Sequence, residues 1–283
     1  MKYINPIAIY HSNCADGFSS AWAIHNKYKD EFIYHPGIYN QPPPDVTNRD
    51  VFLVDFSYTR PVIESMLETA NSITILDHHK TAETELKDLL ANNRLKGEID
   101  MDRSGAMITW NHFYPNEPPP KLIEHVQDRD LWKFNLKHTR EIQSNVFSYE
   151  YKFDIWDKLM NAPIDSLIKD GLAIERKHIK DINELLSVNK HFAKILGYIV
   201  PCCNLSYIHT SDAGSIMAKG YPFAFCYTYR PKGVTLSFRS SPDGIDVSKI
   251  AKLFGGGGHE KSAAASNVSH SRFRWEGELM IIE

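Results

Sequence analysis

The sequence predicts an α/β protein, with a parallel sheet in the first half and a smaller α/β domain in the second. Short apolar runs alternate with segments of helical spacing before residue 160, which is the pattern of βαβ units. A long helical pattern follows, as a connector between domains would require, and aromatic and β-branched strands begin beyond Gly197. We therefore expect a first domain at 1–160, a helical connector at 161–195 and a second domain at 196–283.

Four strands and two helices are expected in the first eighty residues. The strands are Tyr3–Tyr10, Glu31–Tyr34, Val51–Phe56 and Ile73–Asp77, and the helices are Gly17–Tyr28 and Arg60–Ala70. Pro61 stands near the start of the second helix, where a residue without an N–H is well tolerated. Parallel sheets bind ligands at the carboxyl ends of their strands, so the residues that follow these strands are the first candidates for a site.

Further helices are expected at Ser104–Tyr114, Lys121–Trp132 and, as the longest, Pro163–Phe192. In the last third, YPFAFCYTY and GVTLSFRS are typical of strands and DVSKIAKLF of a helix. The run GGGGH, Gly255–His259, is expected between this helix and another helical stretch. Backbone N–H groups in such a loop, near the start of a helix, would bind an anion, and Arg239 would add a bidentate contact. A flexible linker and a surface arginine are the structural alternatives.

Composition narrows the setting. A chain of 283 residues with 42% apolar residues can bury a sizeable core, and its net charge of −3 creates no global field for a long polyanion. Any nucleic-acid contact must therefore be local and short. Four cysteines do not make a disulfide framework, which favours a reducing, cytoplasmic location. Neither a membrane span nor a secretion signal is expected, and no membrane partner.

Polar residues follow three of the predicted strands. His11 to Asp16 come after the first, Asp55 ends VFLVD, and Asp77, His78 and His79 end SITILDHH. Imidazoles mixed with carboxylates suit manganese, iron or zinc, whereas calcium prefers oxygen ligands alone. Two such ions about 3.5–4 Å apart stabilise both the attacking and the leaving oxygen of a phosphoryl group, so the pattern indicates phosphoester hydrolysis.

Each of these residues also has a structural alternative. The histidine pair could belong to an exposed turn, Asp55 could cap the following helix, and His11 could be an ordinary polar strand end. Asp128 and Asp130, in VQDRDLW, could be surface acids on a helix.

Taken together, the motifs resemble the DHH phosphoesterase family. They are HSNCADGFSSAW, FLVDFSY, ILDHHKT, the SGA of DRSGAMITW, VQDRDLW and FRSSPDGIDVSKIAKLFGGGGHEKSA, in the family's order over nearly the whole chain. The last motif is similar to the DHH-associated C-terminal domain of RecJ-like nucleases, nanoRNases and cyclic-dinucleotide phosphodiesterases. The resemblance implies an active-site cleft between the two domains.

Carried over by position, the resemblance implies two divalent metal ions, most often Mn2+. His11 and Asp55 would hold one ion, and Asp16, Asp55, His78 and Asp128 the other. Asp55, Asp77, His78 and His79 would form the catalytic set, in which His79 faces the substrate phosphate and Asp77 orients its histidine neighbour. The substrate would also contact the residues Ser104, Arg239, Gly255, Gly256, Gly257, Gly258 and His259.

The chain departs from the family at Cys14, where an acid is common. A neutral thiol is a weak ligand for manganese, whereas a thiolate favours softer metals. Zn2+, Mg2+ and Fe2+ therefore remain open for the ion near Cys14, and so does a packing role for this side chain.

The expected function is metal-dependent hydrolysis of short single-stranded oligonucleotides or linear dinucleotides to mononucleotides, by a monomer or homodimer. A monoesterase for 3′-phosphoadenosine 5′-phosphate (pAp) and a cyclic-dinucleotide phosphodiesterase are the enzymatic alternatives. Pyrophosphate is disfavoured, since family members acting on it resemble a different C-terminal domain. A catalytically inactive nucleotide-binding protein, with Cys14 as the mark of decay, is the alternative from another class.

Overall fold

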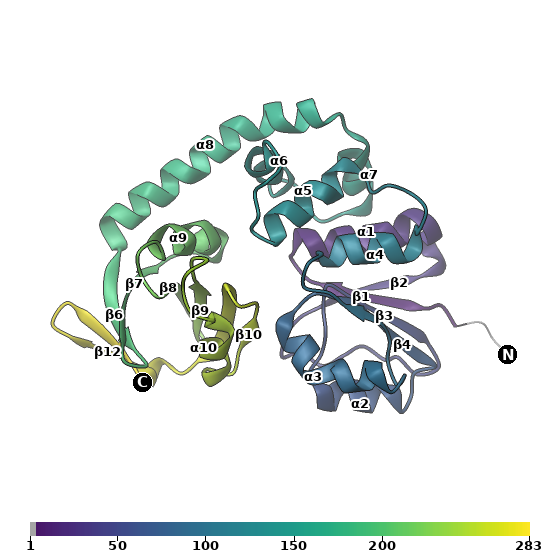
Figure 1. Ribbon diagram of the computed structural model, residues 1–283, viewed down its shortest axis with the longest axis horizontal. Coiled ribbons are helices and arrows are strands. Elements are labelled where there is room, and N and C mark those ends of the chain that lie inside the picture. The colour runs from purple at the N-terminus through teal and green to yellow at the C-terminus, as the bar shows by residue number, and fades with distance from the viewer. Residues whose placement is uncertain (1–3) are drawn as a thin grey trace. The chain divides into compact units, whose positions relative to one another are not determined.

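The computed structural model describes residues 4–283 and is a mixed α/β fold, as predicted (Figure 1). The chain divides into two compact units: unit 1 ends at Glu175, and unit 2 is Arg176–Glu283. The division falls within helix α8 (Ile164–Asn189), inside the predicted connector. Tyr3, the expected start of the first strand, lies outside the described residues.

Unit 1 contains a five-stranded sheet in the order β2-β1-β3-β4-β5. The strands are β1 (Ile7–His11), β2 (Ile33–Gly37), β3 (Asp50–Val54), β4 (Ser72–Asp77) and β5 (Lys96–Ile99). All neighbouring strands run parallel, so the predicted parallel sheet is confirmed. β5 was not predicted, because its sequence KGEI has no apolar run and three of its four residues are exposed.

Helices cover both faces of this sheet (Figure 1). Those on the sheet are α1 (Ala15–Tyr28), α2 (Arg60–Leu67), α3 (Lys80–Ala91) and α4 (Gly105–Phe113). Three more helices, α5 (Lys121–Asp130), α6 (Thr139–Val146) and α7 (Phe153–Asn161), lie beyond α1 and α4 (Figure 1). One face, with Leu53 and Ile75, packs in a single apolar cluster with residues of α2 and α3. The other, with Val54 and Leu76, packs with α1 and α4. Side chains alternate between faces along a strand, so both registers are apolar and the polar residues collect at the strand ends.

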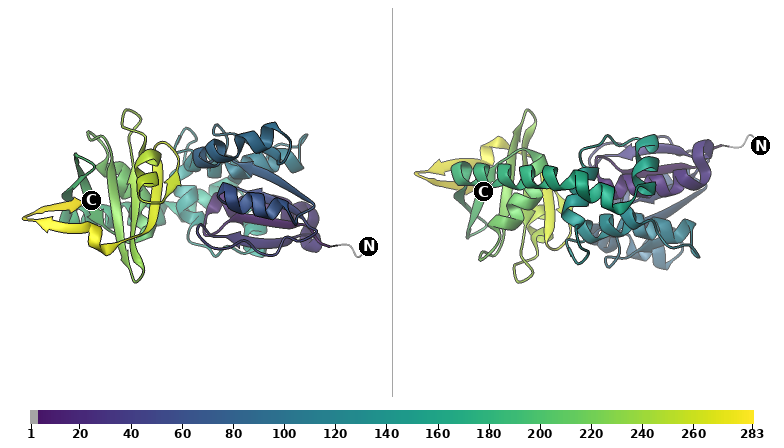
Figure 2. Two further views of the ribbon diagram at one scale, coloured as in Figure 1. Left: turned by 90° about the horizontal axis from the view of Figure 1, so that it is seen from below. Right: turned by 90° about the horizontal axis from the view of Figure 1, so that it is seen from above.

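Unit 2 contains an eight-stranded mixed sheet in the order β10-β11-β9-β8-β7-β6-β13-β12. The strands are β6 (His191–Ile195), β7 (Tyr198–Asn204), β8 (Ala224–Arg230), β9 (Gly233–Arg239), β10 (Gly257–Gly258), β11 (Ser262–Val268), β12 (Phe273–Glu276) and β13 (Leu279–Ile282). The last part of α8 packs with helix α9 (Thr210–Met217) on one face, and helix α10 (Val247–Leu253) packs on the other. The hairpin β12–β13 forms the end of the chain and one edge of this sheet (Figure 2).

The run Gly255–His259 does not lie between two helices, so that prediction is wrong. It follows α10, but Gly257 and Gly258 form β10, and the alanine-rich segment after it is strand β11. A Cβ at Gly256 would clash with the backbone of Ala264 and Ala265. Glycine is therefore required there for the close approach of two strands, and no helix begins beside the loop to supply an anion site.

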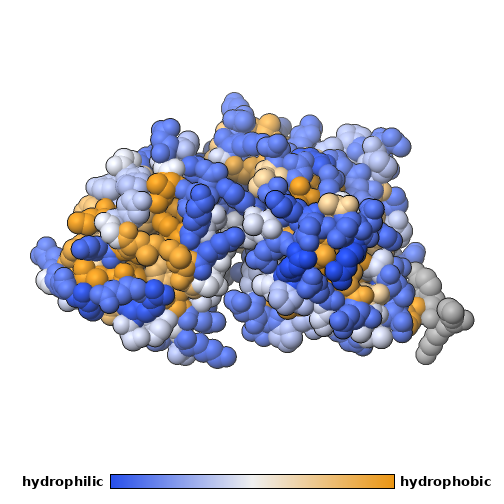
Figure 3. Space-filling view, turned by 60° about the horizontal axis from the view of Figure 1, so that its bottom comes forward, coloured by the Kyte–Doolittle hydropathy of each residue, from blue (hydrophilic) through white to orange (hydrophobic). Residues whose placement is uncertain are grey.

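The surfaces of the two units differ in hydropathy. On the face shown in Figure 3, apolar side chains gather over unit 2, and unit 1 is mainly hydrophilic. Exposed apolar residues of unit 2 include Leu253, Trp275 and Tyr229, with 62%, 53% and 48% of their surface exposed. Among residues 4–283, no helix is both long enough and apolar enough to cross a bilayer.

The core of unit 1 can be tested at Trp156, which is fully buried and donates from Nε1 to Ser19 Oγ at 3.1 Å. We expect Trp156→Ala to lower the free energy of unfolding by about 3–5 kcal/mol, because it removes a large apolar group and leaves a cavity. Chemical denaturation monitored by circular dichroism measures the change. Trp275→Ala, at an exposed site, is the control and should cost about 0.5 kcal/mol or less. Equal losses would contradict the assigned core.

Candidate metal centre

Polar residues from three adjacent strands meet at the carboxyl edge of the unit 1 sheet. His11 ends β1, Asp55 directly follows β3, and Asp77 ends β4 with His78 and His79 after it. Because β1, β3 and β4 are neighbours and parallel, their ends lie side by side. The expectation that these strand ends converge is therefore met in the structure.

Asp55 lies at the centre of the cluster. Its φ of +53° is left-handed, a conformation that aspartate tolerates better than most residues, and its N–H donates to the carbonyl of Leu76 at 3.0 Å. One carboxylate oxygen, Oδ1, is 3.1 Å from His78 Nε2, and the other, Oδ2, is 3.5 Å from His11 Nδ1. Asp55 thus reaches both sides of the cluster, as a bridging ligand must.

Asp16 is held by the start of helix α4. The N–H of Gly105 donates to its Oδ2 at 2.7 Å, and the N–H of Ala106 donates to its Oδ1 at 3.1 Å. A side chain at Gly105 would clash with Cα and Cβ of Asp55, so only glycine allows the helix to approach both acids. This contact explains the glycine of the SGA motif, for which the sequence indicated no role.

His78 joins the carboxylates. Its Nε2 is 3.1 Å from Asp55 Oδ1, 3.3 Å from Asp130 Oδ2 and 3.7 Å from Asp16 Oδ2. Burial opposes the charged imidazole, but Asp130, Asp55 and Asp16 outweigh it and raise the pKa of His78 well above its ordinary value.

His79 has a different partner from its neighbour. Its Nδ1 lies 2.7 Å from Asp77 Oδ1, and the same oxygen accepts the backbone N–H of His78 at 2.7 Å. Burial lowers the pKa of His79, but Asp77 more than compensates and raises it. Asp77 therefore fixes the ring of His79 and the turn of the chain together, with Nε2 of His79 pointing away from Asp77.

Three buried acids, Asp16, Asp55 and Asp77, and the partly buried Asp130 outnumber the three histidines of this edge. Burial, followed by repulsion from Asp55 and Asp130, raises the pKa of Asp16 well above its ordinary value, and burial also raises that of Asp130. Burial acts the same way on Asp55 and Asp77, but nearby histidines hold both pKa values below the ordinary range. Oδ2 of Asp55 and Oδ2 of Asp130 are buried and accept no hydrogen bond.

Such a cluster suits a divalent cation. Within unit 1, two groups offer ligand atoms that lie within 4.8 Å of one another: Asp16, His78 and Asp130 form one, and His11, Asp55 and His79 the other. Carboxylate oxygens and imidazole nitrogens are common ligands of divalent metal ions, and a bound cation would offset the negative charge of the carboxylates. The residues present therefore fit the metal site that the resemblance implies.

Asp128, the predicted ligand, does not belong to the cluster. Its Oδ1 accepts the N–H of Asn135 at 2.8 Å, and its Oδ2 accepts the N–H of Leu136 at 3.0 Å and the hydroxyl of Thr139 at 2.6 Å. These three bonds use both oxygens to hold the loop after α5. Asp130, which the sequence offered only as a surface acid, takes the place beside His78. The two acids of DRD in the sequence indicated a possible ligand here, but the sequence does not show which of them faces the cluster.

The predicted substrate contact of Ser104 is also not supported by the structure. It is fully buried and is the N-cap of α4, with its hydroxyl accepting the N–H of Met107 at 3.3 Å. A side chain with no exposed surface cannot contact a substrate. Its role is to position the helix that binds Asp16.

Cys14 lies at the N-cap of α1, beside the acidic cluster, and belongs to neither ligand group. Burial, and then the charges of Asp55, Asp130 and Asp16, raise the pKa of the thiol well above its ordinary value. In the absence of a cation, the cysteine is therefore a neutral thiol, which is a weak ligand for a hard metal.

The predicted substrate residues of unit 2 lie near one end of its sheet. Arg239 ends β9 opposite Ser262 of β11, and His259 is joined to Ser262 by a backbone hydrogen bond of 2.8 Å. The guanidinium of Arg239 donates to Ser211 Oγ at 2.7 Å, at the start of α9. A Cβ at Gly214 would clash with the aliphatic part of the Arg239 side chain. Ser211 and Gly214 of α9 therefore both determine where this side chain lies.

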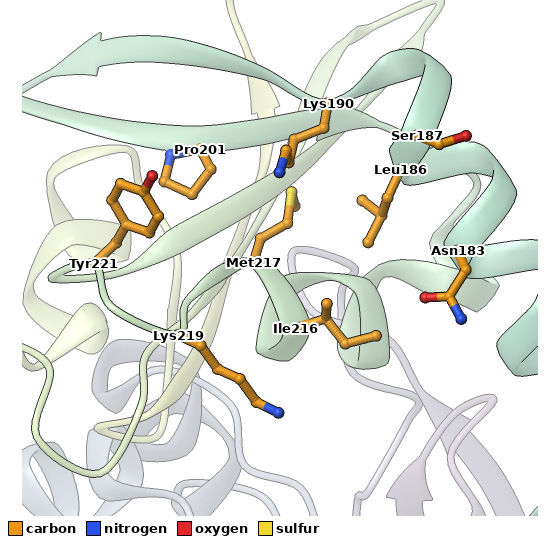
Figure 4. A pocket seen from close by; sticks show the side chains of 9 residues that line it. All are labelled: Asn183, Leu186, Ser187, Lys190, Pro201, Ile216, Met217, Lys219 and Tyr221. Carbon is orange, nitrogen blue, oxygen red and sulfur yellow. The ribbon is translucent and has the colours of Figure 1, made fainter.

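A hollow of about 420 Å3 lies elsewhere in unit 2, between the end of α8 and α9 (Figure 4). Its lining is mixed, with apolar residues, two lysines and a tyrosine: Asn183, Leu186, Ser187, Lys190, Pro201, Ile216, Met217, Lys219 and Tyr221. Neither Arg239 nor the 255–259 loop lines it, so it is separate from the predicted substrate residues.

No protein-family model matches the chain. Uncharacterized protein R106 of Acanthamoeba polyphaga mimivirus is 29% identical over 283 residues, an alignment that covers 91% of this chain and 66% of the relative. The chain thus spans just under two thirds of the length of this curated relative.

Solved structures with a related chain path include two proteins. A pGpG-specific phosphodiesterase from Vibrio cholerae has 13% identity and a TM-score of 0.48, covering 93% of this chain and 92% of that one. An exopolyphosphatase-related protein from Bacteroides fragilis has 13% identity and a TM-score of 0.43, covering 93% of this chain and 87% of that one. Similarity at this level does not identify a function.

Two isosteric variants test whether Asp130, and not Asp128, is the metal ligand. Asp130→Asn should weaken Mn2+ binding by at least about tenfold, since even indirect partners of a ligand contribute that much. Asp128→Asn should instead lower the free energy of unfolding by about 1–3 kcal/mol, because one oxygen becomes a donor facing N–H groups. Isothermal titration and thermal unfolding in chelator measure the two effects. The reverse pattern would restore Asp128 as the ligand.

Metal binding should depend on pH. Asp16, Asp130 and His78 all have raised pKa values, so each keeps its proton to a higher pH than usual, and a cation must displace any proton still bound. The affinity for Mn2+ is therefore expected to rise with pH, and binding should release protons. Calorimetric titration between pH 5.5 and 8.5, in buffers of different ionisation enthalpy, measures both. An affinity independent of pH would contradict this charge assignment.

The same groups determine whether a rise in pH stabilises or destabilises the metal-free protein. A carboxyl with a raised pKa binds its proton more tightly when folded, so the metal-free protein should lose stability as pH rises above the ordinary value of 3.8. His78 acts in the same direction above 6.5, whereas Asp55 and Asp77, with lowered pKa values, lose their contribution as pH falls below 3.8. A bound cation should thus raise the melting temperature more at pH 8 than at pH 5.5.

Proposed function

We propose that the protein is a metal-dependent phosphodiesterase that hydrolyses short oligonucleotides or linear dinucleotides to mononucleotides. The observation that carries this proposal is the cluster of His11, Asp16, Asp55, His78 and Asp130, in which three closely spaced carboxyl groups face two histidines. The ordered motifs that resemble DHH phosphoesterases, from HSNCADG to GGGGH, support the same reaction class.

Asp16, His78 and Asp130 would hold one cation, and His11 would hold a second, with Asp55 shared between them. Bound divalent ions lower the pKa of a coordinated water and neutralise charge on a phosphoryl group. The mixture of imidazole and carboxylate favours Mn2+, and Cys14 keeps Zn2+, Mg2+ and Fe2+ open for the ion nearest to it.

His79 would act on the substrate itself. Asp77 holds its Nδ1 and raises its pKa, so an imidazolium can donate from Nε2 to a phosphate oxygen as negative charge develops there. Loss of Asp77 would leave the ring free to rotate and less basic. In this proposal, His78 and His79 have separate tasks: one contacts carboxylates, and the other contacts the phosphate.

Recognition of the rest of the substrate is assigned to unit 2. Arg239 would contact a phosphate or a base. The N–H groups of Gly255, Gly256 and His259 already donate to carbonyl groups of unit 2, so the side chain of His259 would make the contact of this loop with the nucleotide. The pAp monoesterase, the cyclic-dinucleotide phosphodiesterase and the inactive nucleotide-binding protein remain as outcomes of the test below.

A small substrate panel tests the proposal. With Mn2+, the protein should convert a 5′-labelled dinucleotide and a pentamer to mononucleotides faster than a 30-mer, a cyclic dinucleotide or pAp. Asp55→Asn should reduce every rate to background, because it removes the charge of the shared ligand. Asp50→Asn is the matched control: the same change at the exposed, opposite end of β3 should leave the rates unchanged.

Several results would contradict it. Full turnover in the presence of a chelator would exclude the metal mechanism. Preference for the cyclic dinucleotide or for pAp would replace the proposed substrate, and binding of nucleotides without hydrolysis of any substrate would identify an inactive binding protein.

A further inference from the structure

The segment from the last two residues of helix α5 to the first two of α6 differs in charge from the rest of the chain. Residues 129–140, here called the basic–aromatic loop, contain four Lys or Arg residues and one Asp, a net of +3, whereas the whole chain has a net charge of −3. The segment also contains Trp132 and Phe134. Basic residues interleaved with aromatic ones are typical of surfaces that bind single-stranded nucleic acid, because phosphates meet the cations and bases stack on the rings.

The aromatic and basic side chains pack against one another, and the rings of Trp132 and Phe134 meet edge to face. The guanidinium of Arg129 lies 4.9 Å from the ring centre of Trp132 and 5.0 Å from that of Phe147. The guanidinium of Arg140 lies 3.8 Å from the ring of Phe134, which is 5.0 Å from Trp132. Planar groups of this kind offer successive faces on which bases can stack.

The backbone of this loop is strained and fixed. Trp132, Phe134 and His138 have φ values of +55°, +50° and +67°, which residues other than glycine rarely adopt. The carbonyl of Asp128 accepts the N–H of Lys133 at 2.9 Å, and its carboxylate binds three further groups between residues 135 and 139. Strain of this kind persists only where the surroundings determine it, so the positions of the two rings are fixed in the free protein.

The loop starts at the metal centre. Asp130, whose carboxylate lies 3.3 Å from His78 Nε2, is its second residue, and Trp132 comes two residues later. A strand of nucleic acid whose phosphodiester lay at the cluster would therefore have the loop beside its adjoining nucleotides. Lys133 and Lys137 are exposed, and Asp130 is the one acidic residue of the loop.

We propose that the basic–aromatic loop binds the bases and phosphates of a short single-stranded nucleic acid that adjoin the phosphodiester at the metal centre. This inference rests on the proposed function and narrows its substrate class to linear single strands. Trp132 and Phe134 stack with bases, and Lys133 and Lys137 contact phosphates. The alternative is a purely structural role, in which these side chains contact only one another and stabilise the turn after α5.

Binding of a fluorescein-labelled pentaadenylate, followed by anisotropy in the Asp55→Asn background with Mn2+, tests the inference without cleavage. The double variant Trp132→Leu/Phe134→Leu keeps apolar bulk but removes the rings, and should weaken binding about fivefold to a hundredfold. Lys133→Ala/Lys137→Ala should reduce the slope of log affinity against log salt by about 1.4, which is 0.7 for each lost phosphate contact.

Matched controls lie outside the loop. Trp275→Leu removes an exposed ring, and Lys87→Ala/Lys158→Ala removes two exposed lysines, with no change expected in affinity or in slope. Should the ring variant fail to fold, the lysine pair still decides, since both side chains are on the surface. Affinities and slopes equal to those of the parent would overturn the inference.

The outcome is separable from that of the hydrolase proposal. If wild-type protein cleaves dinucleotides but the loop variants bind the pentamer as the parent does, the loop has no substrate role and the hydrolase proposal stands. If no phosphoester is cleaved but the loop variants lose affinity, the binding surface stands and the hydrolase proposal fails.

Discussion

The placement of four carboxyl groups, three of them buried, at one edge of a parallel sheet is the constraint on which the rest of unit 1 depends. A buried carboxylate is unfavourable unless it is paired or hydrogen-bonded, and the structure meets this need in several ways. Backbone N–H groups at the start of α4 bind Asp16, histidines contact Asp55 and Asp77, and His78 is shared with Asp130. The charge that remains is what makes the edge suitable for a cation.

The sequence predicted those elements whose burial leaves a clear pattern. β1, β3 and β4 are covered on both faces, so they appear as apolar runs, and α8 shows helical spacing over its length. β5 was missed because it is mostly exposed and lacks an apolar run. The segment after the glycine run is alanine-rich and looked helical, but pairing with β9 and β10 makes it strand β11. Tertiary contacts there override local propensity.

The site was predictable where topology alone determines position. Residues that follow parallel strands share one edge, so the convergence of His11, Asp55 and His78 needed no knowledge of packing. The error between Asp128 and Asp130 has another origin. Both acids are near the end of α5, and which one faces the cluster depends on how the following loop folds back. No local pattern records that fold.

The bonds of Asp128 have a consequence for how this region can change over time. Asp128 and Asp130 are two residues apart at the end of one helix. Asp128 holds the following loop and Asp130 faces the metal centre, so the number of residues between them is constrained. Inserting or deleting a single residue between them would rotate one acid by about 100° relative to the other, so that both could not be in place at once. Evolution can therefore vary the residues of the segment much more readily than its length.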